Sequence, residues 1–493
     1  MVSSKNIIMK QLITYKYIVG VALIGLLFTS CKKYDDFQTN PNQPSTSTPG
    51  LLLTGICYSI FYYDNTSASF SDRHLTYYER GNSSQDYSWR EGSFDNYNVL
   101  RQVMQMDSFA TQTGQEQYHG LTKFLRALLF SQITEQFGDI PYSEAMLGLS
   151  GNFKPKYDDQ ESIYKGILQE LEDANNLLDD SKGEIKGDIV YGGVASQWKK
   201  AANALKLRLL IHLSKKEANT NLNIKTQFQN IISDPGKYPL FASNADDAQL
   251  VFNTSAQNNY YPDFGYLSLG TSISMEKGFI KILKDRSDPR LFAMAEPIPG
   301  MDAGIFANYE GVDGGQTLAD QQTASSDASR IKSRYHDDKI NEPWVLIGYA
   351  EQELLIAEAI SRGWITGAGT AQEHYENGIT ASMKFYGIDD ADITTYLAGP
   401  DVAFDTGTAL DQIAVQKYIA LFMKGGYEAF FEQRRTGIPT FNVGPGTYND
   451  MKVPKRWLYP QTEYDYNGGN LEDALQSQYG GNDDVNGVMW LIQ

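Results

Sequence analysis

The sequence is poor in cysteine. Only Cys31 and Cys57 occur among its 493 residues, so at most one intramolecular disulfide can form. A framework of several disulfides, of the kind that supports many small secreted domains, is therefore excluded. The chain must be held together by a hydrophobic core.

Histidine is scarce, and the common catalytic motifs are missing. The five histidines are scattered along the chain, and no H-E-x-x-H, G-x-S-x-G, Walker or G-x-G-x-x-G string occurs. We therefore expect a protein that is not an enzyme, needs no cofactor and holds no catalytic metal ion. A glycoside hydrolase is a minor alternative, because 60 acidic residues offer many carboxylate pairs.

Positive charge is also in short supply. The chain has 42 lysine and arginine residues against 60 aspartate and glutamate residues, which gives a formal net charge of −18 at pH 7. Such a surface repels a phosphate backbone, so nucleic acid is excluded as a partner.

The apolar run near the N-terminus is too short to cross a bilayer. It covers 12 residues, from Tyr17 to Phe28, whereas a spanning helix needs about 20. Three lysines precede it and small residues end it, which predicts a secretory signal peptide over 1–30. The string Phe28-Thr29-Ser30-Cys31 resembles a bacterial lipobox and predicts lipid attachment at Cys31. An ordinary signal peptide with an incidental cysteine is the alternative.

The next segment, 31–50, contains three prolines and few apolar side chains. It buries too little apolar surface to offset its ordering entropy, so we expect a flexible tether. No linker or sharp change of composition divides the remainder. We therefore predict one body over 51–493, with loop-rich insertions.

Apolar residues at helical spacing dominate this body. The clearest stripes begin near His119, Tyr191 and Glu342, and weaker ones cover 97–113, 159–179, 223–233, 274–284, 371–386 and 408–433. Two helices begin near residues 161 and 196, about the 34-residue period of a tetratricopeptide unit. Residues 234–342 and those after 436 read as loops and turns with short strands. The predicted fold class is mainly α, with paired antiparallel helices.

Several strings also carry a family resemblance. They are "DDFQTNPNQP", "FLRALLFSQITEQFGDIPYSEA", "DPRL", "GYAEQELLIAEA", "QKYIALFMKGGYEAFFEQRRTGIP" and "VPKRWLYPQTEYDYNGGN". Together they make the chain similar to SusD/RagB-type nutrient-binding outer-membrane lipoproteins, and to the second SusD-like subgroup in particular. The resemblance implies a right-handed tetratricopeptide-like helical superhelix whose irregular loops carry the ligand surface.

The same resemblance implies a partner and a location. Members deliver an oligosaccharide or a peptide to a SusC-type TonB-dependent transporter, and they are lipid-anchored to the outer membrane, facing the cell exterior. A solenoid scaffold or adhesin that binds a protein is the alternative function.

The candidate ligand surface consists of aromatic and polar residues in predicted loops. Flat rings can stack on sugars or peptide side chains, while amides and guanidinium groups supply directional hydrogen bonds. The candidates are Tyr87, Trp89, Arg90, Asn96, Tyr260, Tyr261 and Tyr309. Trp89 is the first choice, because its neighbours are polar. In the alternative interpretation, these rings anchor the loops to the core.

Two further strings favour structural roles. "NDDVNG" at 482–487 resembles the start of a calcium-binding EF-hand loop, but its twelfth position would be Gln493, which cannot act as a bidentate carboxylate. A structural calcium ion is an option that the sequence leaves open. Arg434 and Arg435 in "RRTGIP" end a predicted helix, where their charge would complement the helix dipole.

Overall fold

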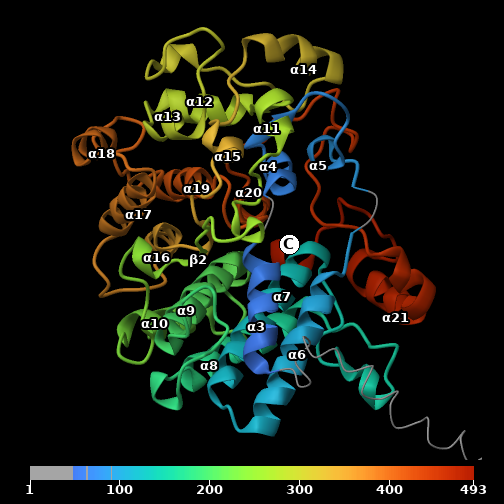
Figure 1. The fold of residues 1–493 in the computed structure, drawn as a ribbon. Helices are drawn as coiled ribbons and strands as arrows, with labels where there is room; N and C mark the ends of the chain where they lie inside the picture. Colours follow the sequence, from blue (N-terminus) through green and yellow to red (C-terminus); the bar gives the residue numbers. More distant parts are fainter. Residues whose placement is uncertain (1–47, 63–64, 90–91) are drawn as a thin grey trace, which may run out of the picture. The chain divides into compact units, whose positions relative to one another are not determined.

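The computed structural model describes residues 48–62, 65–89 and 92–493. The predicted signal peptide, Cys31, Arg90 and most of the predicted tether lie outside these residues. Residues Pro49–Gln493 form one compact unit, which Figure 1 shows as a ribbon. Pro49 and Gly50 already belong to the first described helix, so the predicted tether boundary at residue 50 is two residues too late. Proline is well tolerated in a first helical turn.

Helices supply most of the secondary structure. The longer ones are α3 (Pro49–Phe61), α6 (Asn96–Thr113), α7 (Gln117–Phe137), α8 (Gln160–Leu177), α9 (Ala195–His212), α10 (Ile224–Ser233), α12 (Lys277–Asp285), α16 (Tyr349–Ser361), α17 (Ala371–Phe385), α18 (Asp390–Leu397), α19 (Ala409–Ala420), α20 (Glu428–Thr436) and α21 (Gln461–Tyr479). Short ones are α4 (Thr66–Ser71), α5 (Ser83–Asp86), α11 (Leu267–Thr271), α13 (Arg290–Met294), α14 (Leu318–Ala324) and α15 (Arg334–Asp337). The predicted mainly helical fold is thus confirmed.

The described strands are short and antiparallel. β1 (Leu75–Tyr77) pairs with β3 (Ile273–Met275), and β2 (Ala248–Leu250) pairs with β4 (Trp344–Ile347). Each pair joins segments far apart in the sequence. The strands therefore fasten the long loops to the helices and do not form a layer of their own.

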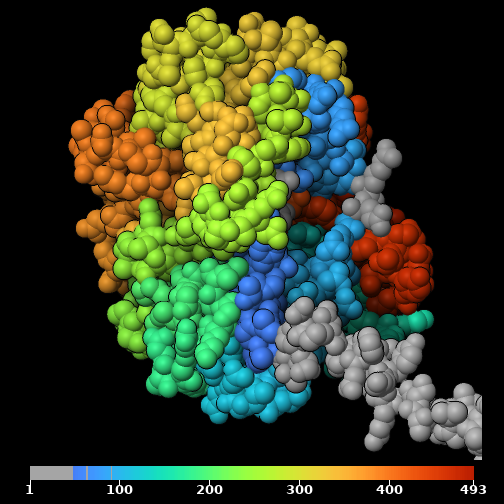
Figure 2. All heavy atoms as spheres, in the orientation of Figure 1, coloured from blue at the N-terminus to red at the C-terminus, as the bar shows by residue number. Residues whose placement is uncertain are grey.

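Neighbouring helices pack in sequence order. α6 packs on α3 and α7, α7 on α8, α8 on α9, and α16 on both α9 and α17. α19 then packs on α16 and α20. Figure 2 shows that the segment from about 270 to 330 gathers at one end of this unit, while the helices from 96 to 212 lie at the other.

The structure differs from the predicted elements at several places, of which three are the clearest. The stripe that begins near Glu342 opens as β4, because Trp344–Ile347 pairs with β2, and the helix starts only at Tyr349. The predicted helix 408–433 is divided into α19 and α20, since Gly425 and Gly426 have positive φ angles of 67° and 61°. α21 falls in a stretch predicted as loop, where glycine and asparagine hid the helical pattern.

The core is continuous across the helices. Trp198 of α9 is fully buried and contacts the rings of Phe61 and Phe124, from α3 and α7. Cys57 is buried as a free thiol in α3. None of the helices in the described part of the chain is both long and apolar enough to span a membrane.

Candidate ligand-binding cleft

A wide cleft of about 970 Å³ opens where four segments meet. These segments are the residues leading into α6, the C-terminal turns of α7, the turn before α20 and the residues leading into α21. Its lining residues are Gly92, Ser93, Phe94, Asp95, Asn96, Asn98, Ile133, Gln136, Tyr427, Trp457, Pro460 and Thr462.

A narrower inner chamber of about 120 Å³ shares Asn96, Gln136 and Tyr427 with the cleft. Its other lining residues are Ser59, Ile60, Val99, Leu129, Gln132, Trp344, Leu346, Gly425, Gly426 and Phe431. The walls are mainly apolar, and the polar groups are the Ser59 and Tyr427 hydroxyls, the Trp344 indole N–H and side-chain amides. The two spaces therefore form one recess with a polar entrance and an apolar end.

The recess carries little charge. Among the described residues that line it, Asp95 is the only carboxylate, and lysine, arginine and histidine are missing. This contrasts with the strongly acidic composition of the whole chain. A neutral ligand with hydroxyl or amide groups fits such a lining better than an ion does.

Gln136 offers a polar group that is available to a ligand. Its side-chain amide makes no hydrogen bond to any part of the chain that the structure describes, and it faces both spaces. Asn96, at the first position of α6, donates from Nδ2 to Gln132 Oε1 at 3.1 Å. This bond orients both amides and leaves acceptor and donor groups for a ligand.

Trp89 lies one layer behind the cleft. Its ring stacks on Trp457 with a centroid distance of 4.1 Å and an interplanar angle of 23°. It also packs against Phe430 and, edge to face, against Tyr87. Trp457 lines the cleft, and Trp89 supports it. Trp89 is partly buried, and the tertiary fold adds three aromatic neighbours to its polar sequence neighbours.

Three other predicted residues are buried rather than displayed. Tyr87 donates from its hydroxyl to Ser71 O at 2.8 Å. Tyr261 packs on Phe252 and Tyr335, and Tyr309 packs on Phe292. The expectation that these rings form an exposed surface is wrong, since they anchor the loops to the core.

Of the remaining predicted residues, one lines the recess and one does not. Asn96 lines both parts of the recess. Tyr260 is half-buried beside Phe264, with Lys339 Nζ 4.9 Å from its ring centroid, and it is not among the residues that line the cleft. Contact of any of these side chains with a ligand stays a prediction.

Trp457, Tyr427, Gln132 and Gln136 were missed as candidates. Each stands in or beside a string already noted for the family resemblance. Their signal could not be separated from that of core residues, because helical spacing and aromatic content look the same for both.

Comparison with known proteins places this geometry in a family. A family model described as starch-binding and associating with the outer membrane matches residues 41–460. The chain belongs to the SusD-like family. No curated protein matches the chain.

Solved structures agree with this assignment. A SusD homologue from Bacteroides fragilis is 37% identical, with a TM-score of 0.84, and the match covers 91% of this chain and 100% of that one. An outer-membrane protein from Bacteroides vulgatus, described in terms of nutrient binding, is 35% identical, with a TM-score of 0.83 and the same coverage. A chitin-binding protein is 26% identical, with a TM-score of 0.74, over 90% of this chain and 100% of that one.

The SusD-like assignment establishes the general function of the chain. The chain is a nutrient-binding protein associated with the outer membrane, and its helical fold is the tetratricopeptide-containing fold of that family. Family members and neighbours are binding proteins, so this chain is a binding protein and not an enzyme.

A buried ion network lies at the centre of this SusD-like fold. It joins five basic side chains from α9, α19 and α20 to five carboxylates from α7, α16 and α20. These are Arg208, His212, Lys417, Arg434 and Arg435, with Glu135, Glu351, Glu358, Glu428 and Glu432. The charges of these ten buried groups balance when His212 is protonated, and the more exposed Arg362 adds a further positive charge beside Glu358.

His212 is protonated because of its neighbours. Burial alone would lower its pKa, but Glu428 and Glu135 outweigh burial and hold the pKa of His212 well above its usual range. The ligand atoms of His212, Glu428 and Glu432 lie within 4.8 Å of one another. A divalent cation there would add positive charge to a balanced cluster, so the geometry favours an ion network over a metal site.

Arg434 and Arg435 belong to this network. Arg434 Nη2 lies 2.6 Å from Glu135 Oε2, and Arg435 Nη1 lies 2.7 Å from Glu358 Oε1. They are buried at the end of α20. The prediction that they end a helix is confirmed, and the structure adds that they join α20 to α7 and α16.

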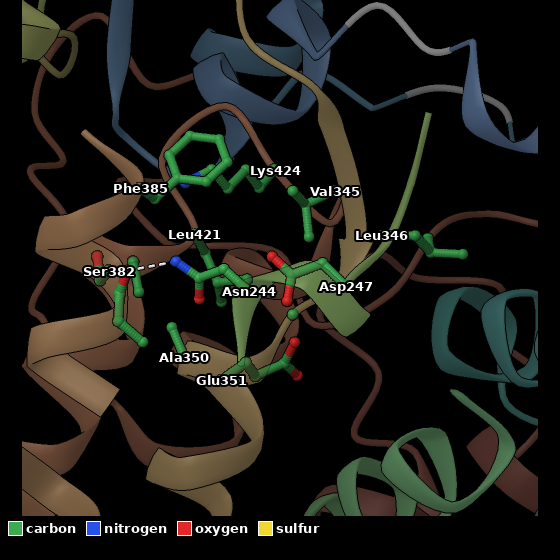
Figure 3. Close-up of a pocket in the computed structure, with 13 residues that line it drawn as sticks. Asn244, Asp247, Val345, Leu346, Ala350, Glu351, Ser382, Phe385, Leu421 and Lys424 are labelled. Atoms are coloured by element: carbon green, nitrogen blue, oxygen red, sulfur yellow. Dashed lines mark hydrogen bonds between the residues drawn. The ribbon is translucent and has the colours of Figure 1, made fainter. Parts of the chain in front are cut away.

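A second pocket holds a buried lysine but little space. Figure 3 shows Lys424 beside the ring of Phe385, and Asp247 next to Asn244. Burial lowers the pKa of Lys424 to about 8 and raises the pKa of Asp247 to about 7. The cavity volume of about 30 Å³ is close to the share of one water molecule in the liquid. It is too small for a sugar ring, so the cleft is the better candidate site.

The first carboxylate of the "NDDVNG" segment is hydrogen-bonded to other parts of the protein. Asp483 accepts hydrogen bonds from Arg456, from Tyr459 N at 3.0 Å and from the Tyr464 hydroxyl at 2.8 Å. These contacts fasten the segment to α21 and the residues before it. A structural calcium ion stays a prediction.

Proposed function

We propose that this SusD-like protein captures a neutral oligosaccharide in the cleft and passes it to a SusC-type TonB-dependent transporter. A lipid on Cys31 would hold it to the outer membrane, facing the cell exterior, through the tether that ends near residue 50. The observation that supports the ligand class is that the Trp457 ring and the Gln136 amide, which has no hydrogen-bond partner in the described part of the chain, line one recess.

The chemistry of the recess favours a glycan over a peptide. Sugar rings present apolar faces that stack on aromatic rings, and their hydroxyls need both donors and acceptors, which side-chain amides supply. A peptide with charged termini or side chains would need ionic partners, which the described lining offers only at Asp95. The starch-binding description of the family and the chitin-binding neighbour support the same class.

A titration tests the ligand class. Neutral oligosaccharides of the starch and chitin types should quench tryptophan fluorescence, whereas peptides of similar length should not. Gln136→Ala should weaken oligosaccharide binding roughly fivefold, since a neutral hydrogen bond contributes about 1 kcal/mol. The melting temperature should stay unchanged, because the amide has no hydrogen-bond partner among the described residues to lose.

Gln112→Ala is the matched control. Gln112 is an exposed glutamine on α6, farther along that helix than Asn96. It should leave both the affinity and the melting temperature unchanged. Tight binding of a peptide, with no response to either oligosaccharide, would exclude the proposed ligand class.

A co-purification experiment tests the partner. Extraction of native membranes in mild detergent should bring a large TonB-dependent barrel along with the acylated protein. Cys31→Ala should abolish labelling with palmitate and leave a precursor that is not anchored. Recovery of the protein without a barrel, at several salt concentrations, would favour the alternative of a free-standing scaffold or adhesin.

A further inference from the structure

The loop between α7 and α8 exposes apolar side chains at its tip. Leu149 is 104% exposed, Phe153 is 78% exposed and Leu147 is 41% exposed. Single exposed apolar residues are common on soluble proteins, but three within seven residues form a patch that water disfavours. We call residues 147–156 the apolar finger.

The apolar finger is held in shape by hydrogen bonds. At its base, the Glu144 carboxylate accepts from Asn152 Nδ2 and from Lys156 N, both at 3.0 Å. Within it, Asn152 N donates to Leu147 O at 3.2 Å, and Gly151 takes a positive φ of 89° that glycine adopts freely. The exposed side chains are therefore presented in a defined arrangement.

α21 fixes the other end of the finger. Asn470 Nδ2 donates to Lys154 O at 3.0 Å, and Asn467 Nδ2 donates to Pro155 O at 2.9 Å. These bonds tie the backbone of the finger to a helix of the main body.

The finger is positively charged on a negatively charged protein. Residues 147–156 contain Lys154 and Lys156 and no aspartate or glutamate, whereas the whole chain has a net charge of −18. Both lysines are exposed, and Glu144 at the base of the finger supplies one opposing charge near Lys156. The local charge suits an anionic surface.

We propose that the apolar finger inserts Leu149 and Phe153 into a lipid surface with anionic headgroups. A few apolar side chains flanked by lysines are sufficient for membrane contact. A stable protein interface needs about 800 Å² and roughly 20 residues on each side, which this small tip does not provide. The proposal requires neither the glycan nor the transporter, so it can fail independently of the proposed function.

Depth-dependent fluorescence tests the insertion. Ser150→Cys would carry an environment-sensitive probe on the acylated full chain, reconstituted into vesicles of phosphatidylcholine with phosphatidylglycerol. Cys57 is buried, and the parent chain, labelled in parallel, measures any background from Cys31 and Cys57. The probe emission should shift to the blue, and a lipid with a shallow spin label should quench it.

Two controls accompany this measurement. A probe at Leu267→Cys, a residue 77% exposed on α11, should show neither the shift nor the quenching. Lys154→Gln combined with Lys156→Gln should lower the insertion constant roughly 30-fold, from the contribution of two lysines. Circular dichroism should show that each variant folds like the parent.

Three results would overturn the proposal. The first is an unshifted and unquenched probe at residue 150 in anionic vesicles. The second is equal insertion into purely zwitterionic vesicles, which would remove the anionic surface as the partner. The third is shielding of the probe only when a co-purified barrel is reconstituted with the protein, which would make the finger a protein contact.

Discussion

Replacing Arg435 by methionine is expected to lower the free energy of unfolding by about 3–5 kcal/mol. The Arg435 side chain is only 3% exposed, and its two Nη atoms lie 2.7 Å from Glu358 Oε1 and 2.6 Å from Glu432 Oε2. Removing the guanidinium leaves excess negative charge in an interior that solvates charge poorly. Unfolding in urea, followed by circular dichroism, measures the loss.

Arg362→Met is the matched control for this prediction. Arg362 also contacts Glu358, at 2.8 Å, but its side chain is 22% exposed. Water screens the partly exposed Arg362 ion pair, so this substitution should lower the free energy of unfolding by about 1 kcal/mol or less. Equal losses for the two variants would contradict the assignment of Arg435 to a buried network.

The network also determines how stability changes with pH. Burial alone would raise the pKa of Glu358, but Arg435 and Lys417 lower it to about 2. The contribution of Glu358 to folding stability is therefore fully present above its unfolded-state pKa of about 4.5. It is lost as the pH falls from there toward 2. His212 has a raised pKa, so its contribution to folding stability is complete below its unfolded-state pKa of about 6.5. That contribution is lost as the pH rises through the folded-state pKa. Together these two groups favour maximum stability between about pH 4.5 and 6.5.

Trp457→Ala is expected to weaken oligosaccharide binding roughly 30-fold or more. A stacked ring at the centre of a contact typically contributes about 2 kcal/mol or more to binding. Trp89→Ala should instead act mainly on stability, with a loss of roughly 3 kcal/mol, because Trp89 packs between Trp457, Phe430 and Tyr87. Dissociation constants and melting temperatures, both measured on each variant, separate the two roles.

Trp490→Ala controls for general destabilisation. Trp490 is half-buried near the C-terminus, with Lys216 Nζ 5.0 Å from its ring centroid, and it does not line the cleft. The Trp490→Ala variant should be less stable than the parent and should bind oligosaccharide with unchanged affinity. Unchanged affinity in Trp457→Ala, measured on folded protein, would remove that ring from the binding site.

The helical part of the fold could be predicted because its signal is local. Leu121, Phe124 and Leu128 recur at helical spacing and are buried in α7, which lies so deep in the core that residues on its other sides are buried as well. The start of β4 could not be predicted in this way. Trp344–Ile347 becomes a strand because it pairs with residues 248–250, and sequence spacing does not contain that partner.

The candidate site was harder to predict for the same reason. Trp89 has polar sequence neighbours, which favoured exposure, but its spatial neighbours are Trp457 and Phe430. Gln136 looks like an ordinary polar position on α7. It becomes a candidate only because Asn96, Tyr427 and Trp457 meet it across the cleft.

The sequence by itself determined the mainly helical class, the SusD-like resemblance, the acidic character of the chain and the lack of catalytic motifs. These follow from composition, short-range periodicity and motif order, which need no knowledge of contacts. Tertiary structure alone decided that Arg434 and Arg435 are buried partners of glutamates on α7 and α16. It also decided which rings line the cleft and which anchor loops, because burial depends on segments that are distant in the chain.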